Sequence, residues 1–361
     1  MVARTRRQAR PARRGASLVL FSLMLVVVLG MVAFAVDVGC LSLVRTQLQV
    51  AADSAALAAA ASMEKSPCDP VAVAQRYASQ NWAGGKAVEL AAADVELGHW
   101  DFGLRTFVPS GTPTNAIRVT ARRDRTAGGE VPLLFARVLG ARSCGIRAQA
   151  VAVFVSNFQG FRRGLGVLPL AIDKGAADAL VAGSGTDQWS WDPETGTVSA
   201  GADGEPEASM YPGDKPAPGN FGTINIGGKS NSTATLSRQI RDGLTAEDLA
   251  PYGGKFELGA DGTLTLQGNP GLSAGIEDAL SSVVGQARIA PIYSQVVDQG
   301  ANAEYTLVGF LGIRIVNVDL KGAMENKRVL IQAGRLLSPD GIPATGPGKS
   351  HWVYAPVHLV Q

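Results

Sequence analysis

The sequence is poor in charge, in aromatic side chains and in the residue types that most often carry catalysis or bind metals. Of its 361 residues, 18% are charged and 6% are aromatic, and only three are histidine and three cysteine. Because neither a CxxC pair nor a His/Cys cluster occurs, we predict no metal site and no cofactor. No G-x-S-x-G motif accompanies His99, His351 and His358, so we predict no catalytic residues and no enzyme. A histidine could still meet a nucleophile in the folded chain, since catalytic triads are assembled in space.

Acidic residues are absent from the first 36 positions, whereas six arginines precede the first acidic residue, Asp37. These are Arg4, Arg6, Arg7, Arg10, Arg13 and Arg14. The rest of the chain holds the other 27 of the 33 basic residues against 31 acidic ones, a net charge of about −4. A slightly acidic body argues against a nucleic-acid partner, because phosphate backbones are bound mainly by lysine and arginine. We expect no small-molecule substrate either.

Residues 15–36 form a long apolar run without a charged residue. As a helix these 22 residues would span roughly 33 Å, enough to cross a hydrocarbon core of about 30 Å. The arginines before the run stay in the cytoplasm under the positive-inside rule. We therefore predict a basic cytoplasmic tip at 1–14, a transmembrane helix at 15–36, and a single-pass protein of the cytoplasmic (inner) membrane. The bulk of the chain then lies in the periplasm or extracytoplasmic space, and the lipid bilayer is its first partner.

Cleavage of the apolar run is disfavoured. A secretory signal has an apolar region of only about 7–15 residues, although Ala33-Phe34-Ala35 fits the pattern of a cleavage site. A prepilin-type signal, cut after Gly15, usually has glutamate at the fifth following position, which is Leu20 here. A buried helix of a soluble protein would not explain the flanking arginines. The sequence therefore predicts an uncleaved anchor.

The helix is expected to continue beyond the membrane over 37–63, where proline is absent and Gly39 is the only glycine. Apolar residues recur there at a 3-4-3-4-3 spacing that places them on one stripe of a helix: Leu41, Val44, Leu48, Ala51, Ala55 and Ala58. An unbroken helix from Gly15 to Ser62 would have 48 residues and a length of about 72 Å. The stripe could pack on the protein's own domain or on another molecule, and the sequence leaves both open.

Several short motifs follow one another along the first 56 residues. They are Arg13-Arg14-Gly15, Asp37-x-Gly39, Gln47-Leu48-Gln49 and the segment 51–56 with Asp53. In this order and spacing the region resembles the N-terminal domain of the TadG-like proteins of tight-adherence (Tad/Flp) pilus systems, and the similarity extends over about residues 13–155. The resemblance implies a non-enzymatic, membrane-anchored component of pilus assembly or tethering. It implies partners among pilus-assembly proteins, such as TadE-like or TadF-like pseudopilins and the secretin apparatus.

The part beyond residue 63 favours short strands and turns, since the chain holds 43 glycines and 19 prolines. Asp69-Pro70 predicts the start of a helix reaching about Trp82, and residues 132–140 fit a second short helix. Residues 116–123 alternate apolar and polar side chains, as in a half-buried strand. We predict an α+β fold, with a TadG-like region at 64–155.

A second strand-rich extracytoplasmic module is expected at 156–361, with helices at 233–242 and 274–284. Its segment 187–214 is rich in aspartate and glutamate. This acidic loop could bind calcium, but it lacks the spacing of an EF-hand, and a solvated loop or inserted hairpin is the simpler interpretation.

The three cysteines, Cys40, Cys68 and Cys144, cannot all pair with one another. Cys68 and Cys144 could form a disulfide in an oxidising periplasm, or both could be unpaired. The sequence does not decide between these states.

Two functions are compatible with these observations. The first is membrane-anchored assembly or tethering of a Tad/Flp-type pilus. The alternative is a membrane-tethered extracytoplasmic module that binds envelope polysaccharide or protein and is unrelated to pili. Neighbouring genes for a pilus ATPase, a prepilin peptidase and TadE-like proteins would favour the first.

Overall fold

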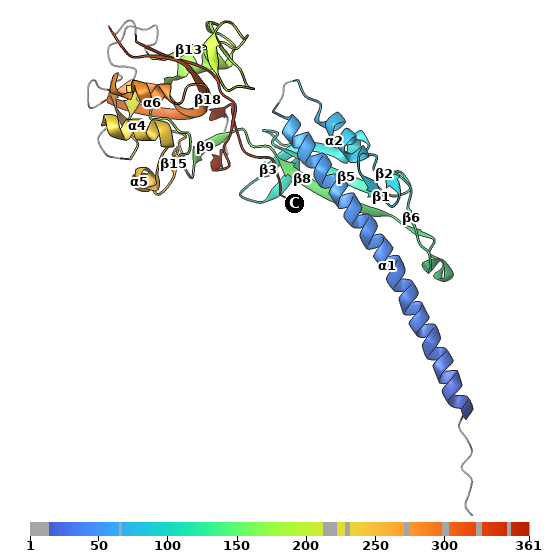
Figure 1. Ribbon diagram of the computed structural model, residues 1–361. Coiled ribbons are helices and arrows are strands. Elements are labelled where there is room, and N and C mark those ends of the chain that lie inside the picture. Colours follow the sequence, from blue (N-terminus) through green and yellow to red (C-terminus); the bar gives the residue numbers. More distant parts are fainter. Residues whose placement is uncertain are drawn as a thin grey trace, which may run out of the picture. The chain divides into compact units, whose positions relative to one another are not determined.

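The computed structural model describes residues 14–64, 67–211, 222–227, 232–270, 274–297, 303–322, 327–344 and 348–360 (Figure 1). Their contacts divide the chain into two compact units. Unit 1 holds the described residues up to Val153 together with those from His358, and unit 2 holds Phe154–Val357. The chain therefore leaves unit 1 after Val153 and returns to it at His358.

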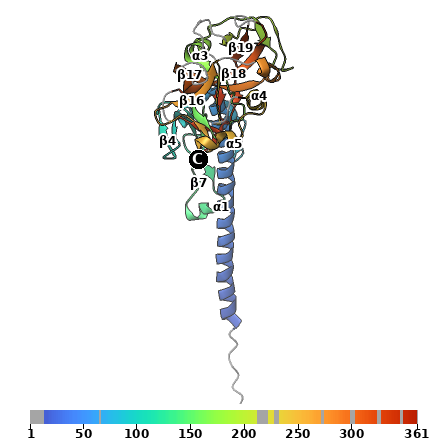
Figure 2. The same cartoon turned by 90° about the vertical axis from the view of Figure 1, so that its left-hand side faces the viewer.

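Unit 1 begins with α1 (Arg14–Ser62), a single helix of 49 residues that matches the unbroken helix predicted from the sequence. Among the described residues it is the one helix whose length and composition suit a membrane crossing. The large apolar side chains from Leu18 to Val36 are 40–70% exposed in the protein itself. In both views no other element of unit 1 covers this end of the helix (Figure 1, Figure 2).

A five-stranded antiparallel sheet lies beside the second half of α1, in the order β24-β8-β5-β3-β4. Its strands are β3 (Val95–Asp101), β4 (Thr106–Pro109), β5 (Ala116–Arg123), β8 (Ile146–Val153) and β24 (His358–Leu359). The strand β5 has the bounds that its alternating side chains predict. The predicted second module extends to residue 361, whereas β24 pairs with β8 in unit 1, opposite Val153 and Ala152.

The apolar stripe of α1 packs on this sheet. Val44 is 4% exposed, and Leu48, Ala51 and Ala55 are fully buried, while Leu41 and Ala58 at the ends of the predicted stripe are half-buried. The helix contacts β8 and β5, whose alternate residues form three buried cross-strand pairs, Ile117–Ala152, Val119–Ala150 and Ala121–Ala148. Because the helix and β8 both present alanine, their backbones can approach closely. The stripe thus packs within the protein's own unit.

The helix α2 (Pro70–Ser79) packs against α1. Its N-cap is Asp69, whose carboxylate accepts a hydrogen bond from the backbone N of Ala72, as the Asp-Pro pair predicts. Asn81 follows the helix and donates from Nδ2 to the Oγ of Ser54 on α1 at 3.0 Å. The short elements β1 (Trp82–Ala83), β2 (Lys86–Ala87) and η1 (Ala92–Asp94) complete this side of unit 1.

A hairpin formed by β6 (Val131–Pro132) and β7 (Ser143–Cys144) carries the 3-10 turn η2 (Ala136–Leu139) at its tip. The sequence predicts a helix over 132–140, but only this single turn forms, because the backbone N of Leu133 donates across the hairpin to the O of Arg142. Gly140 ends the turn with φ of 90°, a left-handed conformation that glycine adopts without strain. The hairpin extends along α1 from the sheet toward the N-terminal half of the helix (Figure 1, Figure 2).

Unit 2 is built on an eight-stranded mixed sheet with the central path β10-β17-β18-β16-β14. Its two longest strands, β17 (Ala287–Val297) and β18 (Ala303–Asp319), pair antiparallel. The other strands are β10 (Ile172–Asp173), β13 (Ala208–Tyr211), β14 (Gly222–Ile224), β16 (Leu264–Pro270), β19 (Arg328–Ala333) and β22 (Ser350–His351).

Three helices share an apolar core with this sheet: α3 (Lys174–Val181), α4 (Thr233–Asp242) and α6 (Glu277–Ser281). The helix α4 has its predicted bounds. The segment 274–284 is divided between η4 (Ala274–Ile276) and α6 rather than forming one helix. The remaining elements of unit 2 are short: α5 (Ala246–Leu249), η3 (Ala250–Tyr252), β9 (Phe158–Phe161), β15 (Phe256–Glu257), β20 (Leu336–Leu337), β21 (Gly341–Pro343) and β23 (Val353–Tyr354).

In the described part of the acidic segment, 187–211, carboxylates accept hydrogen bonds from backbone amides of the same segment. β11 (Trp189–Trp191) and β12 (Val198–Ala200) form the inserted hairpin that the composition allows. Glu207 is 2% exposed and accepts hydrogen bonds from the backbone N of Gln188 and Trp189 and from the Oγ1 of Thr186, at 2.7–2.9 Å. Among the described residues no group of three or more His, Cys, Asp or Glu side chains is arranged to hold a metal. The carboxylate of Glu207 is therefore held by two backbone amides and by the hydroxyl of Thr186.

Candidate functional site

Polar side chains of α1 bind the helix to the rest of unit 1. Gln49 donates from Nε2 to the Oδ1 of Asp53 at 2.8 Å and to the backbone O of Gln149 in β8 at 3.1 Å. Gln47 accepts a hydrogen bond from the backbone N of Gly84 at 2.8 Å. These bonds fix the rotation of the helix about its own axis relative to the sheet. The predicted motif residues Gln49 and Asp53 thus lie together at the contact between helix and sheet.

A buried arginine lies in the same contact. Arg123, at the end of β5, is 4% exposed and donates from Nε to the O of Gly129 at 2.9 Å and from Nη1 to the O of Ala83. A Cβ at Gly84, where φ is 59°, would lie 3.1 Å from Nη1 of Arg123 and 3.2 Å from Cγ2 of Val44. Glycine therefore lets the β1–β2 turn approach the helix. Arg123 is not among the residues predicted from the sequence, although it falls in phase with the buried residues of β5.

Asp37 joins α1 to the tip of the β6–β7 hairpin, just beyond the apolar half of the helix. It is 4% exposed, and its carboxylate accepts hydrogen bonds from the backbone N of Leu134, Phe135 and Ala136 at 2.8, 3.0 and 2.7 Å. The first amides of a helical turn have no partner inside the turn, and a carboxylate satisfies them. Asp37 therefore caps η2 from almost a hundred residues earlier in the chain.

The electrostatics of this cap favour the ionised carboxyl. Burial raises the pKa of Asp37, but the hydrogen bonds from the three amides, that of Ala136 foremost, and the charge of Arg137 lower it more, so the pKa lies below its ordinary value of 3.8. The contact at neutral pH is thus an anion held by backbone donors.

Replacing Asp37 with asparagine should loosen the hairpin tip, because the side-chain amide sets its own N–H groups against the backbone donors. We expect faster hydrogen exchange over 133–139 with unchanged protection of β5, measured by mass spectrometry on the full chain in detergent micelles. The same loosening should appear in the unsubstituted protein as pH falls through the lowered pKa of Asp37, since a depressed pKa stabilises the fold above the unfolded value and this is lost on protonation. After correction for intrinsic exchange rates, D37N should show no such pH dependence.

Asp53→Asn is the matched control, because Asp53 accepts its bond from Gln49 within the same helix and does not contact the hairpin. Equal protection of 133–139 in D37N and D53N would contradict the capping role of Asp37.

Of the other motif residues, Gly39 is the one whose surroundings the structure describes. Gly39 is exposed, and a Cβ added there would meet no atom within 4 Å. Arg14 is the first residue of α1 and Gly15 follows it, whereas Arg13 lies outside the described residues. The roles of these four residues in topology and family stay predictions.

The cysteines are free thiols in the structure, with Cys40 and Cys68 exposed and Cys144 half-buried. Cys144 belongs to the β6–β7 hairpin, whose tip binds Asp37, whereas Cys68 follows the far end of α1 at Ser62. A disulfide needs Cα atoms within about 7 Å of each other. The structure does not bring Cys68 and Cys144 together.

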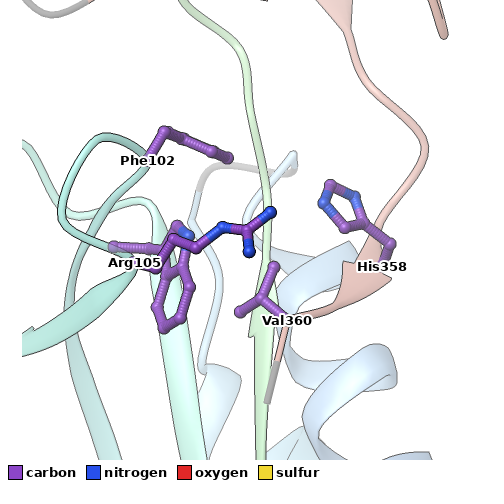
Figure 3. Close-up of a pocket in the computed structure, with 5 residues that line it drawn as sticks. Phe102, Arg105, His358 and Val360 are labelled. Atoms are coloured by element: carbon purple, nitrogen blue, oxygen red, sulfur yellow. The ribbon is translucent and has the colours of Figure 1, made fainter.

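An open pocket of about 580 Å³ lies in unit 1 between the β3–β4 turn and β24. It is lined by Trp100, Phe102, Arg105, His358 and Val360, and the guanidinium of Arg105 reaches into it toward His358 and Val360 (Figure 3). These residues offer a cation, an imidazole and aromatic rings to a molecule that enters the pocket. This pocket is not predictable from local sequence, because its two sides are about 250 residues apart in the chain.

The other two histidines have structural surroundings. The Nδ1 of His99 lies 2.8 Å from the carbonyl O of Pro113 and acts as the donor to it, as expected of a satisfied strand residue. His351 in β22 is half-buried, and this burial lowers its pKa below 6.5, so it is neutral at neutral pH.

Two protein-family models match the N-terminal part of the chain. Residues 15–62 match a model described as Flp pilus-assembly TadE/G-like, and residues 50–152 match a model described as Tad-like Flp pilus-assembly. Together they cover α1 and four of the five strands of the unit 1 sheet. Comparisons with curated proteins and with solved structures give no match.

Proposed function

Because this chain is a TadG-like protein of the Tad/Flp pilus-assembly family, we propose that it is a non-enzymatic, membrane-anchored component that assembles or tethers the pilus. The observation that carries the proposal is α1, which is apolar and exposed from Leu18 to Val36 and buried against the unit 1 sheet from Val44 onward. One continuous helix thus links the membrane to the folded unit. A domain held in this way stays at a set height above the bilayer, where it can meet pilus components.

The proposed topology has the N-terminus in the cytoplasm and both units on the outer face of the cytoplasmic membrane. The six arginines before residue 15 and the absence of charge until Asp37 support this orientation. The partners we propose are the bilayer, TadE-like or TadF-like pseudopilins and the secretin apparatus. Family membership supports this choice, and unit 2, which lies beyond the matched residues 15–152, is the part we expect to distinguish partners.

Deleting the gene should abolish surface pili while pilin synthesis continues, because the protein acts in assembly rather than in supply of subunits. Electron microscopy of the cell surface and pilin immunoblots of whole cells measure the two quantities. Normal piliation of the deletion strain would overturn the proposal and leave the envelope-binding alternative.

Complementing the deletion strain with an anchored and with a released form of the protein tests whether the membrane anchor itself is needed for piliation. The full chain should restore pili. A chain in which residues 1–36 are replaced by a cleavable signal sequence, so that the units are released, should not. Full rescue by the released form would contradict the role assigned to α1.

A further inference from the structure

The tip of the β6–β7 hairpin exposes four large apolar side chains on one short turn. Leu134 is 59% exposed, Phe135 46%, Val138 90% and Leu139 87%. Single exposed apolar residues are ordinary on protein surfaces, but a contiguous group marks a surface that is covered by something other than water.

The position of the tip along α1 is set by Asp37. The backbone N atoms of Leu134 and Ala136 lie 2.8 and 2.7 Å from its carboxylate oxygens. Asp37 directly follows the 22-residue apolar run, whose length of roughly 33 Å is close to the hydrocarbon thickness of about 30 Å. When α1 crosses a bilayer, Asp37 therefore lies at the edge of the hydrocarbon core, and the tip lies at the depth of the lipid headgroups.

We propose that the β6–β7 hairpin tip is a second lipid contact, with the apolar side chains of 134–139 inserted into the outer leaflet of the bilayer that α1 crosses. This proposal rests on the membrane anchoring by α1 and is independent of pilus assembly. The tip also carries Arg137 and Arg142, both exposed, which can reach lipid phosphates while the apolar side chains enter the acyl boundary.

Lipid is the occupant that the geometry favours, because the apolar surface of the tip adjoins the exposed apolar surface of the span. The tip belongs to the same unit as the helix and is tied to it by hydrogen bonds. Once α1 is inserted, the tip cannot leave the interface without breaking the cap made by Asp37. Apolar side chains flanked by arginine at this depth are typical of interfacial segments.

The consequence of this contact is a fixed orientation. A lone transmembrane helix can tilt and rotate about its axis, and these angles are set by packing and by interfacial anchors. The hairpin tip, inserted beside the helix, limits both the tilt of the helix and its rotation about its axis. Unit 1 is then held at a fixed tilt relative to the membrane plane, which a single helix would not ensure.

The test places an environment-sensitive fluorophore at the tip of the full chain. With Cys40, Cys68 and Cys144 replaced by serine, a single cysteine is introduced as Val138→Cys, labelled with NBD, and reconstituted into vesicles of phosphatidylcholine and phosphatidylglycerol. Quenching by a doxyl group at carbon 5 of the lipid chain reports contact with the outer part of the acyl layer. Leu139→Cys repeats the measurement if the first variant fails to fold.

Two further positions act as matched controls. Leu104, in the β3–β4 turn, is 75% exposed, and it lies at the opposite end of the sheet from the hairpin, because β3 ends where β5 begins. Leu104→Cys reports an exposed apolar position away from the membrane. Val27→Cys lies near the middle of the span and reports insertion of α1 itself, read with a doxyl group at carbon 12 of the lipid chain.

We expect the probe at 138 to be quenched several-fold more than the probe at 104 and to emit at shorter wavelength. Quenching at 138 no greater than at 104 would overturn the lipid contact. A blue-shifted probe at 138 that lipid-borne doxyl does not quench would also overturn it, because a protein surface would then cover the tip. If the probe at 27 is not quenched, both the anchor and this proposal fail, whereas quenching at 27 without quenching at 138 removes the tip contact alone.

Discussion

Arginine in place of Ala55 should unfold the helix–sheet contact of unit 1, whereas arginine in place of Ala61 should leave it intact. Ala55 is fully buried and Ala61, less than two turns further along α1, is exposed. An arginine at 55 would place a large charged side chain where Ala55 is fully buried, which costs on the order of 4 kcal/mol through overpacking and a buried charge. A domain is stabilised by only about 5–15 kcal/mol in total. At 61 the side chain extends into solvent, and the change should stay within about 0.5 kcal/mol.

Thermal unfolding of the full chain in detergent micelles measures this difference, with hydrogen exchange assigning it to a unit. In A55R the amides of β5 and β8 should lose their protection, while the strands β17 and β18 of unit 2 keep theirs. The same melting temperature for A55R and A61R would contradict the packing of the stripe on its own sheet, and would favour an intermolecular role for it.

Alanine in place of Glu207 should destabilise unit 2. The carboxylate is 2% exposed and accepts bonds from the backbone N of Gln188 and Trp189 and the Oγ1 of Thr186. Removing it leaves these donors without their partner inside the protein, where each unpaired donor costs about 1–3 kcal/mol. We expect a loss of roughly 2–4 kcal/mol in the free energy of unfolding of unit 2.

Glu194→Ala is the matched control for this prediction, because Glu194 is exposed in the β11–β12 turn. It should change the stability by no more than about 0.5 kcal/mol. Glu207→Gln should fall between the two, since the amide keeps one acceptor oxygen but turns its N–H₂ group toward other donors. If Glu207→Ala melts like Glu194→Ala, then solvent rather than Glu207 satisfies the amides of the acidic segment.

The elements that sequence reasoning predicted well are those whose signal is local. The helix α1 follows from an apolar run, a regular stripe and the absence of proline, and all of these lie within Arg14–Ser62. The strand β5 and the helix α4 have their predicted bounds for the same reason, because their side chains alternate or recur with the period of the element. The cap of α2 by Asp69 is local as well.

The hairpin tip shows where local signals fail. The sequence of 132–140 suits a short helix, but the backbone N of Leu133 bonds across the hairpin to the O of Arg142 instead of within a helix. The carboxylate of Asp37 accepts the first amides of the single turn that forms. Asp37 was recognised as a motif residue and as the charge that ends the span. Its partner could not be predicted, because nothing near it in the sequence indicates residues 134–136.

The sequence by itself determined the long helix of this protein and the apolar run in its first half, because hydrophobicity and helical period act over neighbouring residues. Tertiary structure alone decided that the stripe of α1 packs on its own sheet and that Gln49 joins the helix to that sheet. It also decided that Arg123 joins β5 to β1 and that the last strand returns to unit 1. These contacts join residues tens to hundreds of positions apart. They depend on shape, hydrogen-bond geometry and burial in the folded chain. The periodicity of a single segment therefore does not predict them.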